Sequence, residues 1–495
     1  MADLLKHLPD KTTRIYLLAG IVFLLTAWFS TGYNHFDEHF QVIEFAALKL
    51  GLIKAADLPW EYGCRMRPAL QPLVVCALYK IASPSAIANP FFVAFLVRLF
   101  SALLTFYSIH LVIRLYSPWL ASRQLRYALL LLSFFLWFVP YNGARFASET
   151  LAGRIFLAGM ALFFLQKDQR AKDYLFNGIV LGFAFVVRYQ CGFMVAGYLA
   201  WLLLVRRSGL RNAGAFCAGL LVALATGILV DRWFYGEWVL TSWNYFSQNL
   251  LQGKASTFGT GPWWYYIEQT LINAFPPLSL VYIAAVFLYF YYYPKDVITW
   301  VLVPFLAAHF LIPHKEIRFL FPVIGFLPVM IVRVLDAIGR RNGYSWLEGR
   351  AFRISRRVFW SLNSLMLILL IFRPADDGIA LYRTLWNRYD KPARLCFSGD
   401  NPYHRAKVDI HFYKRPGLAL TPVDSLSQVV PVRDTVTLLV TPKPLVVPLE
   451  GFSAELVYST YPQWVRHFNF NHWMDRTSFW HVYEIKPAGF PIHQP

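Results

Sequence analysis

The sequence predicts a mainly α-helical membrane protein, with a bundle of about 11 spanning helices and a small C-terminal α/β domain outside the cytoplasm. Hydrophobic residues make up 57% of the 495 residues and charged residues only 15%, whereas soluble domains have roughly 25% charged residues. The apolar residues gather in stretches close to the length of about 20 residues that a helix needs to cross a bilayer. The composition therefore excludes a water-soluble globule, and it excludes a disordered chain because apolar residues dominate.

The spanning helices follow from the apolar stretches in chain order. A break at Arg188-Tyr189-Gln190 separates two of them closely. The expected spans lie at residues 14–30, 91–115, 126–141, 148–166, 174–188, 190–206, 213–231, 276–293, 297–312, 318–337 and 357–373.

Positive charge gathers in short runs between the apolar stretches, and the densest run extends from Arg333 to Arg357. If the N-terminus is cytoplasmic, every such run falls on the cytoplasmic side, as the positive-inside rule requires. The net charge of +19 is therefore a topology signal, and we expect no nucleic acid as a partner. The first span lacks an A-x-A cleavage pattern and is typical of a retained signal anchor.

The segments on the opposite face are residues 31–90, 142–147, 232–275, 313–317 and everything after 374. Residues 31–90 form a large outer loop, in which we expect a helix on the membrane surface from Val42 to Lys49 and a re-entrant or interfacial piece at 69–82. The sequence thus predicts a transmembrane domain at residues 1–373 and a soluble extracytoplasmic α/β domain at 374–495. Strands are expected at 394–397, 408–412, 435–440 and 479–483, where β-type runs are bounded by Gly, Pro, Asp or Asn.

Two adjacent acids, Asp37 and Glu38, follow the first span and are flanked by His35 and His39. Acids with nearby imidazoles at a membrane boundary can supply a general base that takes a proton from an attacking hydroxyl. The alternative is a solvated polar loop that caps the following helix, since Asp or Asn before a helix accepts backbone N–H bonds. Composition alone favours the alternative.

Three potential cations, His314, Lys315 and Arg318, stand between two late spans, on the same face as Asp37. Ionisable groups at span ends mark ligand pathways, because their presence there costs free energy unless something pairs with them. Lys and Arg bind phosphate through charge-assisted hydrogen bonds. The alternative is a topological anchor, which the positive-inside rule disfavours on the outer side.

Further arginines occur on the outer face at Arg65, Arg67, Arg145 and Arg188. Arg98 lies within the span at 91–115, where its guanidinium must face protein or water, or reach the headgroups. A structural ion pair is the simpler role for any single one. Together they make the outer face cationic, and an anionic lipid headgroup is the natural partner.

Aromatic residues fill the outer segment from Asp231 to Tyr266, including Asn244-Tyr245 and Trp263-Trp264. Aromatic girdles occur at membrane interfaces whatever a protein does, and this explains most of these rings. Rings beside an Asn also suit stacking on a sugar or contact with an isoprenoid chain.

Three ordered motifs resemble glycosyltransferase family 22 of the GT-C superfamily, which includes GPI-anchor and dolichol-linked-glycan mannosyltransferases. They are N-H-x-D-E-x-x-Q after the first span, W-E with R-x-x-x-x-P, and H-K-E-x-R-F between late spans. Phe36 and Pro68 depart from the family pattern, in which Pro and Ser are usual. The matching residues are Asn34, His35, Asp37, Glu38 and Gln41; Trp60, Glu61, Arg67 and Pro72; and His314, Lys315, Glu316, Arg318 and Phe319.

The resemblance implies a GT-C-type bundle that transfers mannose, with inversion, from a polyprenyl-phosphate-mannose donor to a lipid-linked or glycolipid acceptor. Asp37 would be the base and Glu38 would assist it. The implied donor phosphate ligands are His314, Lys315, Arg318 and Arg67, and the implied substrate-binding residues are His35, Gln41, Glu61, Asn244, Tyr245, Trp263 and Trp264. The resemblance implies no metal and no cofactor, with the lipid-phosphate sugar as substrate. Asp37 and the later cations would then converge beside one cavity.

Two other classes of function stay open. A lipid-glycan flippase or secondary transporter would predict pseudo-symmetric halves with broken helices, and the polar motifs gather on one face instead. A receptor or scaffold would leave the outer acids and cations without a purpose. No nucleotide-binding motif occurs, which points away from an ATP-driven pump. We expect a monomer whose active face is periplasmic or ER-lumenal, and the absence of a retrieval signal in residues 491–495 favours the bacterial inner membrane.

Overall fold

The computed structural model describes residues 10–83, 87–405, 407–445, 451–476 and 479–487. These residues form two compact units, each of which is made of separate chain segments. The first unit comprises residues 1–30, 60–84 and 95–373, and the second comprises residues 31–59, 85–94 and 374–495.

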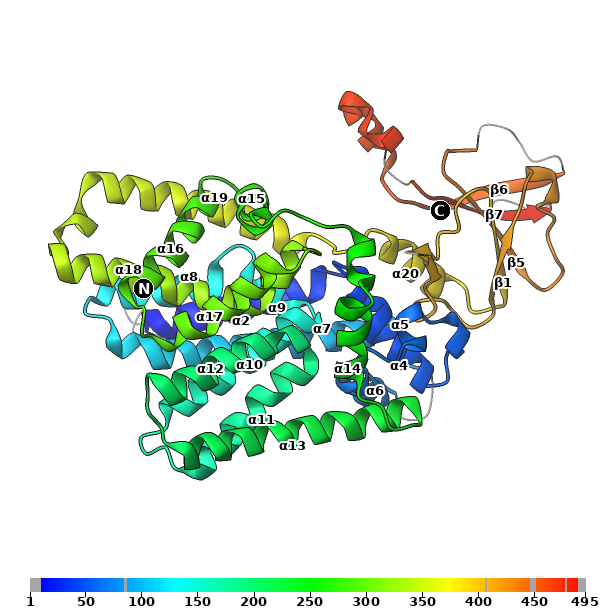
Figure 1. The fold of residues 1–495 in the computed structure, drawn as a ribbon. Helices are drawn as coiled ribbons and strands as arrows, with labels where there is room; N and C mark the ends of the chain where they lie inside the picture. The colour runs from blue at the N-terminus through cyan, green and yellow to red at the C-terminus, as the bar shows by residue number, and fades with distance from the viewer. Residues whose placement is uncertain (1–9, 84–86, 406, 446–450, 477–478, 488–495) are drawn as a thin grey trace. The chain divides into compact units, whose positions relative to one another are not determined.

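The first unit is a helical bundle (Figure 1). Its longer helices, of which α7 begins in the second unit, are α2 (Lys11–Phe29), α6 (Leu70–Ala82), α7 (Pro90–Tyr116), α8 (Arg123–Phe135), α10 (Ser148–Leu165), α11 (Ala171–Val187), α12 (Gly192–Leu204), α13 (Leu210–Tyr235), α15 (Tyr265–Asn273), α16 (Leu278–Tyr292), α17 (Val297–Leu311), α18 (Leu327–Asn342) and α19 (Arg350–Phe372). Shorter turns are α5 (Trp60–Gly63), η3 (Ser117–Trp119), α9 (Val139–Ala144), η4 (Tyr189–Cys191), α14 (Thr241–Phe246), η5 (Ser247–Leu251), η6 (Lys254–Phe258), η7 (Ile317–Phe326) and η8 (Ser345–Glu348).

Six helices of the described chain are long and apolar enough to cross a membrane, at Lys11–Phe29, Pro90–Trp119, Ser148–Leu165, Leu210–Tyr235, Ile317–Asn342 and Arg350–Phe372. Shorter apolar helices occupy Leu70–Ala82, Tyr189–Leu204, Leu278–Tyr292 and Val297–Leu311. The predicted membrane-spanning helical bundle is thus confirmed, while the number of spans stays a prediction.

Prolines explain where the helices differ from the expected spans. The expected span at 126–141 is wrong as a single helix, because α8 ends at Phe135 and α9 restarts at Val139 with Pro140 in its first turn. The expected span at 318–337 begins instead as the 3₁₀ helix η7, which contains Pro322. Proline has no N–H to donate and clashes with the preceding turn, so an α-helix rarely runs through it. The expected break at Arg188 is confirmed, since α11 ends at Val187.

Small residues let α11 and α13 lie side by side (Figure 1). A Cβ atom on Gly178 would come within 2.0 Å of the Phe216 carbonyl oxygen, and one on Gly219 within 2.1 Å of the Leu175 carbonyl oxygen. Both helices therefore approach through backbone rather than through side chains, as small-residue motifs allow in membrane helices.

Buried arginines tie the start of the bundle together. Arg98 is 4% exposed, and its Nε donates to the Ala27 carbonyl at 2.8 Å. Arg145 is 2% exposed, and its Nη2 donates to Ser30 Oγ at 2.7 Å. Both guanidinium groups thus face protein, which satisfies the requirement that an intramembrane charge be paired or hydrogen-bonded.

The second unit combines the outer loop with the C-terminal region. Its helical turns are α3 (Phe36–Glu38), η1 (His39–Ile43), α4 (Glu44–Lys49), η2 (Ala55–Asp57), α20 (Gly378–Arg388), η9 (Leu426–Gln428), η10 (Gln463–Phe468) and η11 (Phe470–Arg476). Its strands are β1 (Ala393–Phe397), β2 (His404–Arg405), β3 (Val408–Asp409), β4 (Leu418–Pro422), β5 (Val436–Thr441), β6 (Phe452–Ser459) and β7 (His481–Pro487). The helix expected from Val42 to Lys49 is present as parts of η1 and α4, and its place on the membrane surface stays a prediction.

Five strands form one sheet in the order β4-β1-β5-β7-β6 (Figure 1). β1 pairs in parallel with β4 and β5, and β7 pairs antiparallel with β5 and β6. The predicted strands at 394–397 and 435–440 are confirmed as β1 and β5, whereas β4 and β6 were missed. The expected strand at 408–412 shortens to β3, and the one at 479–483 begins at His481. On one face Cys396, Leu439 and Ile485 form a buried core. The predicted small C-terminal domain with strands is thus confirmed, while its bounds and its side of the membrane stay predictions.

Replacing Gly219 by alanine should destabilise the bundle by about 1–3 kcal/mol, because the added Cβ meets the carbonyl of Leu175 and forces the helices apart. Thermal unfolding of the detergent-purified protein measures the loss. Gly214→Ala on the same helix is the matched control, since nothing lies within 4 Å of its added Cβ, and it should leave the melting temperature unchanged or raise it. Equal melting temperatures for the two variants would contradict the close approach.

Candidate active site

The Asp37 segment belongs to the second unit and begins with a short helical turn. His35 caps this turn, because its Nδ1 accepts from the Asp37 backbone N–H at 3.2 Å. The Glu38 carboxylate accepts from the Asn34 N–H at 3.0 Å and is largely buried. The Asp37 side chain is 23% exposed, with its Oδ1 3.7 Å from His35 Nδ1. The cap of the turn is thus His35, which removes the reason for reading Asp37 as the helix cap.

A π-helical turn, η1, follows Asp37 and buries the next polar residues. His39 and Glu44 are each 1% exposed, and Gln41 is 8% exposed. His39 Nε2 lies 2.9 Å from Glu44 Oε1. Single π-turns inside helices are rare and occur frequently at functional sites.

Glu149 is the centre of an ion-pair network in the first unit. Its carboxylate is 2% exposed, and its Oε1 lies 2.9 Å from Arg318 Nη1 and 3.2 Å from Arg188 Nη2. Arg188 Nη1 also donates to Ser148 Oγ at 3.2 Å. Three elements, α10, the break after α11 and η7, thereby meet at one carboxylate.

A close backbone approach brings α10 and η7 together. Gly153 lies one helical turn after Glu149, and a Cβ there would come within 2.4 Å of the Pro322 carbonyl oxygen. Pro322 in turn lies four residues after Arg318. The missing side chain at Gly153 therefore sets the separation at which Arg318 reaches Glu149.

Two acceptors face the ring nitrogens of His314 and favour its cationic form. Its Nδ1 lies 2.8 Å from the Gly259 carbonyl oxygen, and its Nε2 lies 3.2 Å from Glu316 Oε1. Both ring nitrogens face acceptors, so both donate when the ring is protonated. The hydrogen bond to Glu316 raises the pKa of His314, although burial opposes it. Glu316 also binds Arg318, with Arg318 Nε 2.6 Å from Glu316 Oε2.

Lys315 is buried and stands between His314 and Glu316 in the chain. Unlike His314 and Arg318, it has a backbone carbonyl rather than a carboxylate as its partner. It is 7% exposed, and its Nζ donates to the Ile312 carbonyl. Among the ion pairs of the described chain, none within 4.0 Å includes Lys315. Burial lowers the pKa of Lys315, as desolvation disfavours a charged amine. Its ammonium is therefore the group of this cluster that most needs an anion.

Arg67 comes from the outer loop and packs against the same part of the bundle. Its Nη2 lies 3.6 Å from Glu61 Oε1, and its guanidinium stands 5.6 Å from the ring centroid of Tyr245. The Tyr245 hydroxyl accepts from Gln190 Nε2 at 2.6 Å. Gln190 is two residues from Arg188. The break after α11 therefore contacts Tyr245, which packs on Arg67, and reaches Arg318 through Glu149.

Phe258 links the motif that contains Trp60 to the motif that contains His314 through aromatic contacts. The ring of Phe258 stacks on Trp60 at 6.3 Å between centroids, and it lies 6.3 Å from the ring of His314. Backbone hydrogen bonding agrees, since Gly261 N donates to the Pro313 carbonyl at 2.9 Å. The structure thus brings together Glu61, Arg67, Tyr245, His314, Lys315 and Arg318 around η6 and the break.

Asp231 anchors the outer loop on α13. Its Oδ1 accepts from the Ala69 N–H at 2.8 Å, and its Oδ2 accepts from Thr241 Oγ1 at 2.5 Å. The Thr241 hydroxyl also lies 2.6 Å from the Tyr189 hydroxyl. This buried acid holds the segment after Arg67 in place, which is a structural role.

Other predicted site residues lie further out. Asn244 Nδ2 donates to the Arg65 carbonyl at 3.1 Å and so stabilises the loop. Trp263 and Trp264 are 63% and 49% exposed, as rings of a membrane-interface girdle are. Asp37 and the cations belong to different compact units, and their convergence stays a prediction.

Sequence reasoning missed Glu149 as a site residue and treated Arg188 as one arginine among several. A signal was present, because Glu149 is an acid at the start of an otherwise apolar stretch, where ionisable residues mark function or pairing. Its two arginine partners are 39 and 169 positions away in the sequence, and no local pattern identifies them.

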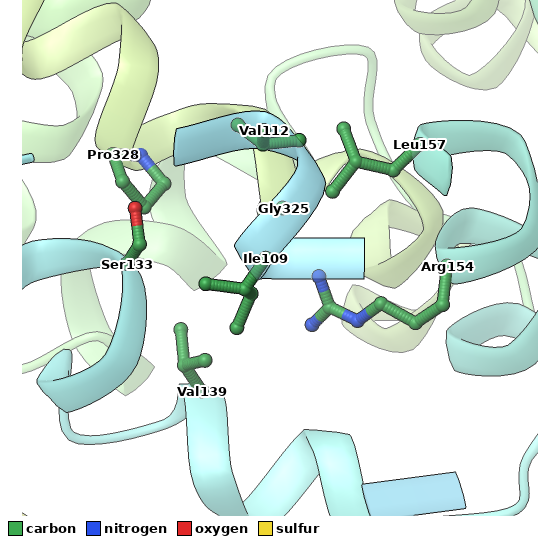
Figure 2. Close-up of a pocket in the computed structure, with 8 residues that line it drawn as sticks. All are labelled: Ile109, Val112, Ser133, Val139, Arg154, Leu157, Gly325 and Pro328. Carbon is green, nitrogen blue, oxygen red and sulfur yellow. The ribbon is translucent and has the colours of Figure 1, made fainter. Parts of the chain in front are cut away.

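A small cavity lies beside Arg154, which is five residues after Glu149 on α10 (Figure 2). Arg154 is 3% exposed, and its Nε and Nη2 have no hydrogen-bond partner in the described structure. Figure 2 shows the guanidinium directed between the side chains that line the cavity, including Ile109 and Val139. The volume of ≈ 10 Å³ suits about one water molecule. The cavity is too small for a sugar or a lipid.

The sequence model of the Alg9-like mannosyltransferase family matches residues 14–416. Human GPI alpha-1,2-mannosyltransferase 3 is 23% identical over 380 residues, which cover 74% of this chain and 62% of the relative. The bovine enzyme of the same name is 24% identical over 304 residues, covering 59% and 53%. Mannosyltransferase APTG1 of Arabidopsis thaliana is 24% identical over 409 residues, covering 79% and 71%. The chain thus spans a little over half the length of the mammalian relatives.

A solved structure shares the fold over nearly the whole chain. It is ArnT from Cupriavidus metallidurans bound to undecaprenyl phosphate, with a TM-score of 0.59, 11% identity, and coverage of 97% of this chain and 99% of that chain. The predicted GT-C-type fold is therefore confirmed. Since the family model matches from the first spanning helix into the C-terminal region, the chain belongs to the Alg9-like mannosyltransferase family.

Proposed function

We propose that this protein is an integral membrane inverting mannosyltransferase that uses a polyprenyl-phosphate-mannose donor and a lipid-linked or glycolipid acceptor. The family and the names of the relatives support mannosyl transfer. The fold shared with ArnT, whose structure contains undecaprenyl phosphate, supports a lipid-phosphate donor. The active face is the one opposite the basic loops, which is periplasmic in a bacterial inner membrane and lumenal in the endoplasmic reticulum.

The buried ammonium of Lys315 is the observation that supports this donor most strongly. His314 and Arg318 stand on the same segment as Lys315, and we call these three residues, together with Arg188 and Arg67, the cationic cluster. Each of the other four cations of the cluster has a carboxylate partner. Lys315 has no carboxylate within 4.0 Å among the described residues, so its charge is not balanced by an acid. A buried positive charge without a carboxylate is unfavourable until an anion binds. A polyprenyl phosphate arriving from the membrane is such an anion.

The reaction follows as a single displacement. The acceptor hydroxyl oxygen attacks the anomeric carbon of mannose from the face opposite the phosphate, the bond to the phosphate oxygen breaks, and the configuration inverts. Asp37 takes the hydroxyl proton, which makes the oxygen a better nucleophile. Lys315 and Arg318 stabilise the charge that develops on the leaving phosphate. These side chains neutralise a monophosphate leaving group, so the proposal requires neither a metal nor a cofactor.

The direct test incubates the purified protein with radiolabelled polyprenyl-phosphate mannose and a lipid extract, followed by identification of the labelled product. We expect mannose in a new glycosidic linkage on a lipid acceptor. Scrambling of the lipid-linked sugar across a reconstituted bilayer without a glycosidic product would contradict the proposal and favour a flippase.

Asp37→Asn should lower kcat by about 10²- to 10⁴-fold, because an amide cannot accept the hydroxyl proton. The measurement is mannosyl transfer at equal protein level, with the donor Kd determined in parallel and expected to be unchanged. Asp434→Asn is the control, since its carboxylate is 93% exposed and Asn tolerates its positive φ of 58°. Near wild-type activity of Asp37→Asn would remove the base from the mechanism.

Lys315→Met should reduce kcat by about 10²-fold, which is typical for the loss of one group that stabilises the developing charge, and should weaken donor binding as well. Titration with polyprenyl phosphate and initial rates measure the two effects. The exposed Lys295 provides the control Lys295→Met. Unchanged donor affinity together with unchanged kcat would exclude Lys315 from the phosphate site.

The donor affinity should fall as the pH rises through the raised pKa of His314, because the ring loses its positive charge there. Glu316→Gln removes the hydrogen bond that raises this pKa, so the inflection should move to lower pH. Donor KM measured against pH in both proteins gives the two inflections. Identical profiles would show that His314 does not act through its charge.

A further inference from the structure

The loop that contains Asp37 is attached to the C-terminal region on both sides of this acid. Before it, the Thr31 carbonyl accepts from the backbone N–H groups of Ala375 at 2.8 Å and Asp376 at 3.2 Å. At Gly32, with φ +84°, a Cβ would come within 2.6 Å of Asp376 Cβ and 2.8 Å of Ile379 Cγ1. The chain therefore enters the Asp37 turn pressed against the start of α20.

After Asp37, one carboxylate makes the second attachment. Glu44 Oε1 accepts from the backbone N–H groups of His411 at 2.8 Å and Phe412 at 3.0 Å. The same oxygen is the partner of His39 Nε2 at 2.9 Å. The His39 ring stacks on Tyr413, with centroids 5.4 Å apart and an interplanar angle of 13°.

This attachment is buried, which distinguishes it from a surface ion pair. Glu44 and His39 are each 1% exposed, so neither gains compensation from water. A carboxylate in such a place depends on its hydrogen bonds. All hydrogen bonds of the Glu44 carboxylate in the described structure fall on Oε1, while Oε2 has no hydrogen-bond partner there. The turn at 411–412 and the helix that follows Asp37 are therefore joined by buried hydrogen bonds, and both belong to one compact unit.

We propose that the C-terminal domain is the scaffold that positions Asp37, and that Glu44 is the positioning residue through which it acts. The inference rests on the proposed role of Asp37 as the base. Glu44 lies about two helical turns beyond Asp37, so it does not touch the reacting atoms. It sets where the turn at 36–38 stands, and a displacement of about 1 Å at a reacting group lowers the rate by about 10²-fold.

The test compares Glu44→Leu and Glu44→Gln in the purified full-length protein. Leucine removes the acceptor, and we expect kcat to fall by about 10²-fold while the KM for the donor and the Kd for polyprenyl phosphate stay unchanged. Glutamine retains one oxygen for the two N–H groups, so its kcat should stay within about tenfold of wild type. Glu455→Gln, which removes a half-exposed carboxylate paired with Arg388 and Lys486 in the same unit, is the matched control and should be fully active.

A double variant separates positioning from general stability. If Glu44 acts only through Asp37, then Glu44→Leu combined with Asp37→Asn should be no slower than Asp37→Asn alone, because groups that act as a unit are not additive. Multiplicative losses would overturn the inference, and so would wild-type kcat in Glu44→Leu. A loss of kcat, donor affinity and melting temperature together, in both Leu and Gln variants, would show a structural role and would also overturn it.

The same set of variants distinguishes the positioning role of Glu44 from the proposed role of Asp37 as the base. An inactive Asp37→Asn beside a fully active Glu44→Leu refutes the positioning role alone. An active Asp37→Asn refutes the proposed base, and the positioning role with it.

Discussion

A charge inside an apolar bundle has to be paired, and the pairing of Glu149 with Arg188 and Arg318 organises the first unit. One buried carboxylate draws the start of α10, the break after α11 and the turn η7 to a single point. If the three elements separated, Glu149 would lose its arginine partners. A buried carboxylate without partners is unfavourable by several kcal/mol, so this pairing holds the elements together. The positions of His314 and Lys315, which directly precede Glu316 and Arg318 on the same segment, follow from this constraint.

The chemistry of the proposed reaction is divided between the two compact units. The groups suited to a phosphate come from the bundle, where Lys315 is buried without a carboxylate and the neighbouring cations are balanced by acids. The proposed base comes from a loop that folds with the C-terminal region. Under the proposed mechanism, this division would give the C-terminal domain a function in catalysis through the position of Asp37.

Much of the fold was predictable because it depends on composition and local pattern. Apolar stretches of spanning length, the break at Arg188, and the strands β1 and β5 were identified from the sequence, since each reflects a short-range preference of the chain. The interruption of the expected span at 126–141 was missed even though Pro140 signals it. The strands β4 and β6 were missed because Leu418–Pro422 and Phe452–Ser459 have weak alternation, and pairing with β1 and β7 decides their conformation.

The sequence by itself determined the membrane-spanning class, the family and the residue types of the candidate site, because these depend on composition and on motifs read within a few positions. The tertiary structure alone decided that Glu149 joins Arg188 to Arg318, that Phe258 connects the Trp60 and His314 motifs, and that Glu44 binds the turn at His411. The physical reason is the same in each case. Buried side chains find partners tens to hundreds of positions away, and the packing of backbone at small residues such as Gly153 sets the distances at which those partners meet.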